Sequence, residues 1–207
     1  MRRLVTHRLS RRSLLATLAS GTTVAVAGCL GSDTAESDDS AANGSTSTDD
    51  PPEFPDHPGD TPIDPPEGRR CDGPCGMTPA AYPDSNAQLV HEGGEGVFFD
   101  SVGCLVAYRH DPTFYDGPES PIDRVWARDF GTEELMDAED AVFVHDYDKD
   151  RHEEIMAHNP KPFADRDDAV DYVDTHDDLG ENDIVELDFF GAEEAHGYRD
   201  YPIPEDG

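Results

Sequence analysis

Two thiols and a thioether stand within seven residues of one another in Cys71–Met77, which reads Cys-Asp-Gly-Pro-Cys-Gly-Met. Thiolate and thioether are soft ligands, which suit Cu(I) better than hard ions such as magnesium or calcium. Gly76 lets the backbone turn, so that the sulfur atoms of Cys75 and Met77 can face one ion. The segment is therefore interpreted first as a soft-metal site, with Cu(I) as its ion.

Further along the chain, Ile155-Met156-Ala157-His158 offers a second thioether and an imidazole. In a strand, Met156 and His158 lie on the same face; their alternative roles are core filler and surface polar residue. Cys104, between Val102 and Leu105, is expected to be a core residue of a helix, and Met136 is expected to be core as well. The predicted metal ligands are thus Cys75, Met77, Met156, Cys71 and His158.

The cysteine count leaves other interpretations of the thiols open. Of the four cysteines, Cys29 is expected to be lipidated, which leaves Cys71, Cys75 and Cys104. An exported chain with an odd number of remaining cysteines holds a free thiol or an intermolecular bridge. A disulfide between Cys71 and Cys75, with Cys104 buried, is one alternative. A closed zinc site is disfavoured, since it requires four Cys or His ligands. A thioredoxin-like motif is disfavoured by the three-residue spacing and by Pro74.

The N-terminus carries an export signal. Ser10–Leu15 contains the twin arginines Arg11 and Arg12, and an apolar run follows to Ala27, which is too short to span a bilayer. Val26-Ala27-Gly28-Cys29 resembles a lipobox, in which Cys29 is the lipidated residue; an uncleaved membrane anchor is the alternative. We expect the protein on the extracytoplasmic face of the cell membrane, held by a lipid anchor.

Acidic residues dominate the composition. The signal holds five of the 15 basic residues and none of the 47 acidic ones, so its removal leaves a net charge of −37. Such a chain resembles proteins of extreme halophiles, and it lacks the basic face that nucleic acid requires. Residues 29–67 are rich in Ser, Thr, Asp, Glu, Gly and Pro, which predicts a disordered spacer. The predicted organisation is a signal over 1–28, this spacer over 29–67 and a folded domain over 69–207.

The folded part is predicted to be α+β, with two strand–strand–helix units in one compact domain. Phe99 and Phe163, and the possible helix caps Ser101 and Asp165, recur at an offset of 64 residues, as do two pairs of helix residues. Asp100 is a second possible cap for the first helix. The predicted strands are Gln88–His91, Val97–Phe99, Arg124–Phe130, Ala141–His145, Glu154–His158 and Ile184–Phe190.

The ordered set of motifs resembles the NosL family of copper lipoproteins, accessory proteins of nitrous oxide reductase in denitrification. Its members carry Cys-x-x-Cys-Gly-Met, then Ala-Gln, then Phe-Asp-Asp-x-x-Cys ahead of a tyrosine, and later a Met-containing segment before a helix. The corresponding segments here are Cys71–Met77, Ala87-Gln88, Phe99–Cys104 with Tyr108, and Met156–Phe163. Two departures are the additional residue between Cys71 and Cys75, and Ser101 in place of the second acidic residue.

The resemblance implies a Cu(I)-binding metallochaperone that supplies the copper–sulfide centre of nitrous oxide reductase. It implies that reductase and a copper-supply transporter as partners, and a fold related to the core of organomercurial lyase. The sequence offers no nucleophile–base pair, phosphate loop or carboxylate dyad, so we expect a carrier and not an enzyme. The alternatives are an exported thiol–disulfide redox protein that uses Cys71 and Cys75, and a general heavy-metal scavenging lipoprotein.

Overall fold

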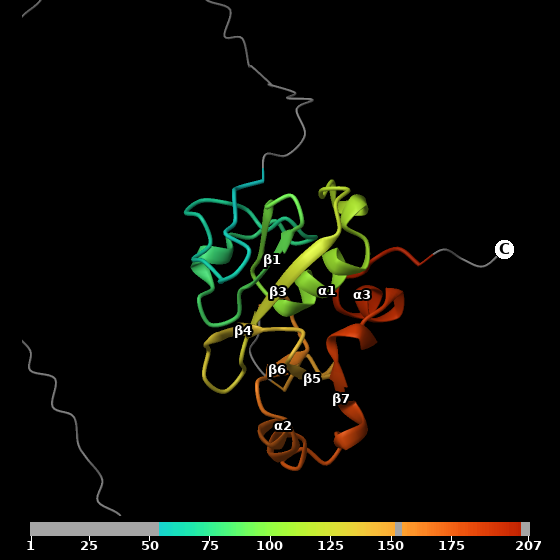
Figure 1. Ribbon diagram of the computed structural model, residues 1–207. Coiled ribbons are helices and arrows are strands. Elements are labelled where there is room, and N and C mark those ends of the chain that lie inside the picture. The colour runs from blue at the N-terminus through green and yellow to red at the C-terminus, as the bar shows by residue number, and fades with distance from the viewer. Residues whose placement is uncertain (1–53, 152–154, 204–207) are drawn as a thin grey trace, which may run out of the picture. The chain divides into compact units, whose positions relative to one another are not determined.

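The structure is a computed structural model, and it describes residues 54–151 and 155–203. The predicted signal, Cys29 and most of the predicted spacer lie outside these residues. Within them, two antiparallel sheets are combined with α-helices (Figure 1). The first sheet has the order β2-β1-β3-β4 and the second the order β6-β5-β7. The strands are β1 (Ala87–His91), β2 (Gly96–Phe99), β3 (Ile122–Arg128), β4 (Leu135–Asp137), β5 (Val142–Val144), β6 (Lys161–Phe163) and β7 (Ile184–Glu186). The α-helices are α1 (Val102–His110), α2 (Arg166–Val173) and α3 (Ala192–Arg199).

The same arrangement of strands and helix occurs twice. In each half the first strand is central, the second pairs on one side of it, a helix follows, and the third strand pairs on the other side. The second strands end at Phe99 and Phe163, and the helix caps are Ser101 and Asp165, so the offset of 64 residues is structural. The prediction of an α+β fold with two strand–strand–helix units is confirmed.

The helix α1 lies between the first sheet and α3. Every residue from Val102 to Tyr108 is buried, and Cys104 and Leu105 are fully so. The core on the sheet side contains alternate strand residues such as Leu89, Val97 and Val125. Tyr198 of α3 belongs to the same core, and Figure 1 shows α3 beside α1. A short helix that is enclosed in this way is stabilised by packing and not by helix propensity.

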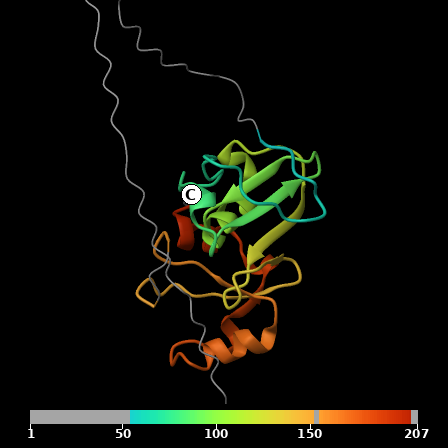
Figure 2. The same cartoon turned by 90° about the vertical axis from the view of Figure 1, so that its left-hand side faces the viewer.

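The opposite face of the first sheet is covered by residues of the predicted spacer. His57 stacks on Trp126 with ring centroids 5.0 Å apart, and its Nε2 lies 2.9 Å from Gln88 Oε1. Ile63 exchanges two hydrogen bonds with the Gln88 amide, of 2.9 and 2.8 Å. Figure 2 shows this part of the chain, in cyan, beside the sheet. The spacer boundary at residue 67 is therefore wrong, because the folded part includes residues from Phe54 onward.

Three further corrections concern secondary structure. Residues 155–158, part of the predicted strand Glu154–His158, form a turn in which Met156 and Ala157 have φ of 60° and 75°. The strand comes later, as β6, and Pro162 is tolerated within it because β6 is an edge strand. The predicted closing strand ends at Glu186. β4 and α3 were not expected.

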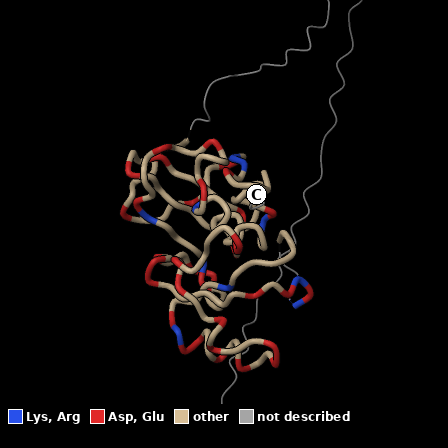
Figure 3. Tube along the Cα trace, turned by 90° about the vertical axis from the view of Figure 1, so that its right-hand side faces the viewer, with Lys and Arg blue, Asp and Glu red and all other residues tan. Residues whose placement is uncertain are grey.

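Acidic residues are spread over the described chain, and Lys and Arg are sparse (Figure 3). Several of the arginines are bound to aspartates; Arg151, for example, pairs with Asp146, Asp148 and Asp178. None of the helices in the described part of the chain is long and apolar enough to cross a membrane.

Candidate metal centre

The loop Cys71–Met77 is closed on itself and fixed to the end of β2. The Cys71 N–H donates to the Met77 carbonyl at 2.6 Å. Asp72 donates its N–H to Phe98 O at 3.1 Å and accepts the Phe98 N–H on its carboxylate at 3.0 Å. Gly73 lies so close to α1 that a Cβ there would be 3.2 Å from the Cys104 carbonyl oxygen. The loop therefore brings its two thiols against the start of α1.

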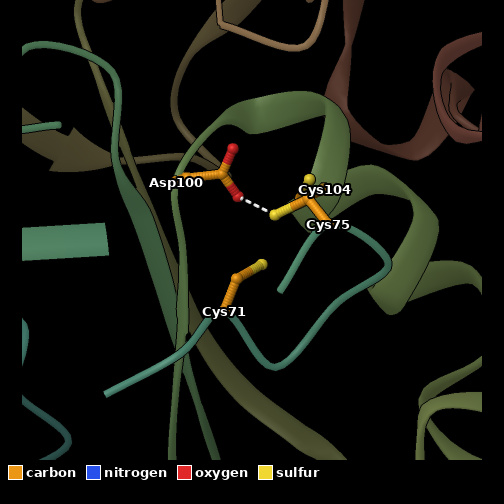
Figure 4. A group of neighbouring side chains, drawn as sticks. All are labelled: Cys71, Cys75, Asp100 and Cys104. Atoms are coloured by element: carbon orange, nitrogen blue, oxygen red, sulfur yellow. Dashed lines mark hydrogen bonds between the residues drawn. The ribbon is translucent and has the colours of Figure 1, made fainter. Parts of the chain in front are cut away.

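Four ligand atoms converge at this point (Figure 4). The sulfur atoms of Cys71, Cys75 and Cys104 and a carboxylate oxygen of Asp100 all lie within 4.8 Å of one another. The Cys75 thiol donates a hydrogen bond of 2.5 Å to Asp100 Oδ1. The three cysteines are free thiols, so the disulfide alternative is not the state of this structure.

The four residues differ in exposure. Cys104 and Asp100 are fully buried, and Cys71 is 7% exposed. Cys75 is half-buried. Asp100 Oδ2 is buried and has no hydrogen-bond partner, which is costly for a carboxylate unless a cation or proton occupies that position. Within this group, an incoming or leaving ion reaches the solvent on the side of Cys75.

The thiols are coupled electrostatically. Hydrogen bonds from Cys71 and Cys75 and the positive charge of Arg199 lower the pKa of Cys104. Their hydrogen bonds to Cys104 raise the pKa of both Cys71 and Cys75. Burial raises the pKa of Asp100, and the negative charge of Cys104 adds to that effect. Cys104 therefore loses its proton more readily than Cys71 or Cys75 does, and a metal ion that binds all three sulfur atoms must displace the protons of those two.

Arg199 at the end of α3 completes the surroundings of Cys104. Its Nε donates to Cys104 Sγ at 3.1 Å, and one terminal nitrogen donates to Ser101 Oγ at 2.8 Å and to Asn159 Oδ1. The other terminal nitrogen donates to the carbonyls of His158 and Tyr198. Ser101 holds the N-cap position of α1, as predicted, but its side chain makes no cap hydrogen bond.

The two predicted thioether ligands, Met77 and Met156, share one cavity. Met77 and Met156 both line a cavity of about 800 Å³ that also borders Ser101 and Val102, at the start of α1. The Met77 N–H lies 3.5 Å from Cys75 Sγ, so this methionine is adjacent to the thiols. The cavity therefore lies at the start of α1 and shares Met77 with the loop that carries the thiols, although none of the four ligand residues lines it.

His158, the fifth predicted ligand, lies elsewhere. Its Nε2 pairs with the Gly197 carbonyl at 2.9 Å, and its ring packs against Tyr147 and Tyr198. It is linked to the thiols only through its backbone carbonyl, which accepts from Arg199. Of the predicted set, the structure thus brings Cys71 and Cys75 together, with Met77 beside them.

Sequence reasoning missed Cys104 and Asp100 as members of the group. Cys104 stands among apolar residues at helical spacing, which is typical of a core position. Asp100 precedes the helix and reads as a cap. The signal that would have found them is the Phe-Asp-x-x-x-Cys motif, since it places both groups on the same end of one helix.

A family model described as NosL matches residues 62–181, more than half of the chain. No curated protein matches. Among solved structures, the chain is similar to the copper chaperone NosL from Shewanella denitrificans, with 14% sequence identity and a TM-score of 0.42. That similarity covers 59% of this chain and 97% of the other. Because the family model matches more than half of the chain, the chain belongs to the NosL family.

Proposed function

We propose that this protein is an exported, lipid-anchored Cu(I) carrier that supplies copper for the copper–sulfide centre of nitrous oxide reductase. The observation that carries the proposal is the convergence of three reduced thiols and one carboxylate within 4.8 Å. The twin-arginine signal and the lipobox at Cys29 support export and anchoring. Membership of the NosL family supports copper as the cargo.

The donor set favours Cu(I). Thiolates select soft ions, and two or three sulfur atoms are enough to bind Cu(I), so the site needs no metal bond from Asp100. Asp100 is placed to take the Cys75 proton as the ion binds, because the two groups already share a hydrogen bond. The proposed first ligands are therefore Cys71, Cys75 and Cys104; Asp100 accepts the Cys75 proton, and the Cys71 proton is released to the solvent.

Release of the Cu(I) ion requires a side of the site that the ligands of a recipient protein can reach. Cys75 is the most exposed of the three thiols in the described residues. Met77, whose N–H lies 3.5 Å from Cys75 Sγ, lines the cavity together with Met156. A thioether binds Cu(I) more weakly than a thiolate does, so Met77 suits an ion that is passing from the cluster toward a recipient ligand. A carrier of this kind exchanges ligands and performs no bond-breaking chemistry, which agrees with the expectation of a non-enzymatic protein.

The experiment is a competition between the reduced protein and a Cu(I) chelator in molar potassium chloride, with X-ray absorption on the Cu(I) form. Cys75→Ser and Cys104→Ser should each lower the affinity by at least about tenfold, and the spectrum should show sulfur neighbours. Met77→Leu should lower it less, and Met136→Leu, outside the site, should have no effect. Only nitrogen and oxygen neighbours, or full binding by both serine variants, would refute the assignment.

Delivery is tested separately. Copper-loaded protein is mixed with nitrous oxide reductase lacking its copper–sulfide centre, with sulfide supplied, and the centre is followed by its absorption. Formation should exceed that with an equal amount of chelated Cu(I). An equal yield from the chelate would favour the general scavenging alternative. A Cys71–Cys75 disulfide that cycles with a thiol partner, without copper, would favour the redox alternative.

A further inference from the structure

The guanidinium of Arg199 is buried, and no carboxylate in the part of the chain that the structure describes pairs with it. The residue is 7% exposed, and the five groups that accept its hydrogen bonds are the Cys104 sulfur, the oxygens of Ser101 and Asn159, and two backbone carbonyls. Among the described residues, no Asp or Glu forms an ion pair with it. This is unusual in a chain with 47 acidic residues, because a buried cation normally requires a counter-charge.

Of the side chains that the structure describes, Cys104 is the only ionisable one that accepts a hydrogen bond from Arg199. Its Nε lies 3.1 Å from Cys104 Sγ, and the other four contacts hold the guanidinium in that orientation. Gly103 makes the position available, because a Cβ there would lie 2.6 Å from the guanidinium carbon. Arg199 also lies beyond residues 62–181, the part matched by the family model.

We propose that Arg199 determines the charge preference of the thiol cluster, so that the cluster favours a monovalent soft ion over a divalent one. This inference rests on the proposed function, since it takes the cluster to be the copper site. Arg199 is a positioning and specificity-determining residue in it and binds no metal itself.

The distance between Arg199 and the bound ion determines how strongly the guanidinium repels a second positive charge. A metal ion bound to Cys104 lies about 2.3 Å from its sulfur, and therefore at most about 5.4 Å from Arg199 Nε, given the 3.1 Å between Nε and Sγ. At that separation and an effective dielectric constant of about 20, a second positive charge on the ion lowers the affinity by roughly a factor of 100. Burial limits the screening of this repulsion by salt.

The test measures Cu(I) and Zn(II) affinities of the reduced, full-length protein by chelator competition at one pH in molar potassium chloride. The quantity compared is the ratio of the two affinities. A rise in the proton affinity of the thiols weakens the binding of both ions, and this effect largely cancels in the ratio. The loss of a fixed positive charge does not cancel, because it affects Zn(II) more than Cu(I). Arg199→Gln should lower the preference for Cu(I) over Zn(II) by at least about tenfold. Arg199→Lys, which keeps the charge, should leave the ratio within about threefold of the wild type.

Arg124→Gln is the matched control, because it removes one positive charge from a half-exposed side chain that pairs with Asp137. The ratio of its Cu(I) and Zn(II) affinities should equal that of the wild type. An unchanged ratio in Arg199→Gln, with both affinities reduced, would overturn the inference and leave Arg199 a structural residue. An equal fall in Arg124→Gln would overturn it in favour of the general charge of the protein.

If Arg199→Gln does not fold, Arg199→Lys decides the matter: a ratio within threefold supports the inference, and a tenfold fall despite the retained charge overturns it. Failure of the wild-type protein to bind Cu(I) through sulfur is a distinct outcome. It refutes the proposed function itself, and the inference with it.

Discussion

Replacing Gly103 with alanine has two opposite effects on the stability of the fold, and their sizes can be compared. Gly103 lies in the first turn of α1, and alanine in a helix is favoured over glycine by up to about 1 kcal/mol. The new Cβ, however, would lie 2.6 Å from the carbon and one terminal nitrogen of the Arg199 guanidinium. Carbon and nitrogen atoms pack at about 3.5 Å or more, so the guanidinium must move by roughly 1 Å.

The terminal nitrogen that is displaced donates to Ser101 Oγ and Asn159 Oδ1. A hydrogen bond from a charged donor contributes about 1.5–3 kcal/mol, so their loss costs about 3–6 kcal/mol. After the gain in helix propensity, the net destabilisation is about 2–5 kcal/mol. A domain of this size loses about 2–4 °C in melting temperature per kcal/mol, which predicts a fall of about 4–20 °C.

The assay is thermal unfolding followed by circular dichroism in molar potassium chloride. Gly180→Ala is the control, because a Cβ there meets nothing within 4 Å and the backbone φ of −160° suits any residue. That variant should melt within about 2 °C of the wild type. If Gly103→Ala melts at or above the wild-type temperature, helix propensity outweighs the guanidinium contacts and the reasoning fails.

Three other predictions concern stability. Removing residues 1–53 should leave the melting temperature unchanged, whereas removing 1–67 should lower it by about 4 °C or more, since His57 is lost from Gln88 and Trp126; equal melts would contradict the packing of this segment. Burial lowers the pKa of His145 in the folded protein. Below pH 6.5 the unfolded chain therefore binds a proton at His145 that the folded chain does not bind, and the free energy of unfolding falls on acidification. His145→Phe should therefore lose less stability between pH 7 and 5 than the wild type, and parallel curves would argue against this. Melting temperature should rise equally with sodium and potassium chloride between 0.1 and 1 M, as the screening length falls from about 10 to 3 Å; no dependence on salt would show that self-repulsion is unimportant.

The first half of the fold could be predicted because its signals are local. The Gly94 turn has φ of 89°, which glycine adopts readily, and apolar residues stand on both sides of it. The helix after Ser101 has apolar residues at helical spacing and ends before Pro112. In the second half, Phe163 and Asp165 repeat the same signals.

What could not be predicted depends on contacts between distant segments. The spacer composition predicts disorder, yet His57 is buried because Trp126 and Gln88 form a surface for it. Met156 takes a positive φ that its residue type disfavours, so no local pattern marks that turn. Cys104 has the sequence neighbours of a core residue, and only the folded loop at Cys71 makes it part of a thiol group.

The contact between Arg199 and Cys104 has a consequence for biosynthesis, because the two residues are 95 positions apart. At about 5–20 residues per second, the ribosome adds Arg199 roughly 5–20 s after Cys104. During this interval the three cysteines of the cluster exist in the nascent chain, but the guanidinium that contacts Cys104 does not. The timing of metal loading therefore matters. An ion that binds the unfinished chain contacts thiols without Arg199 beside them, whereas an ion that binds after α3 has docked contacts the complete centre.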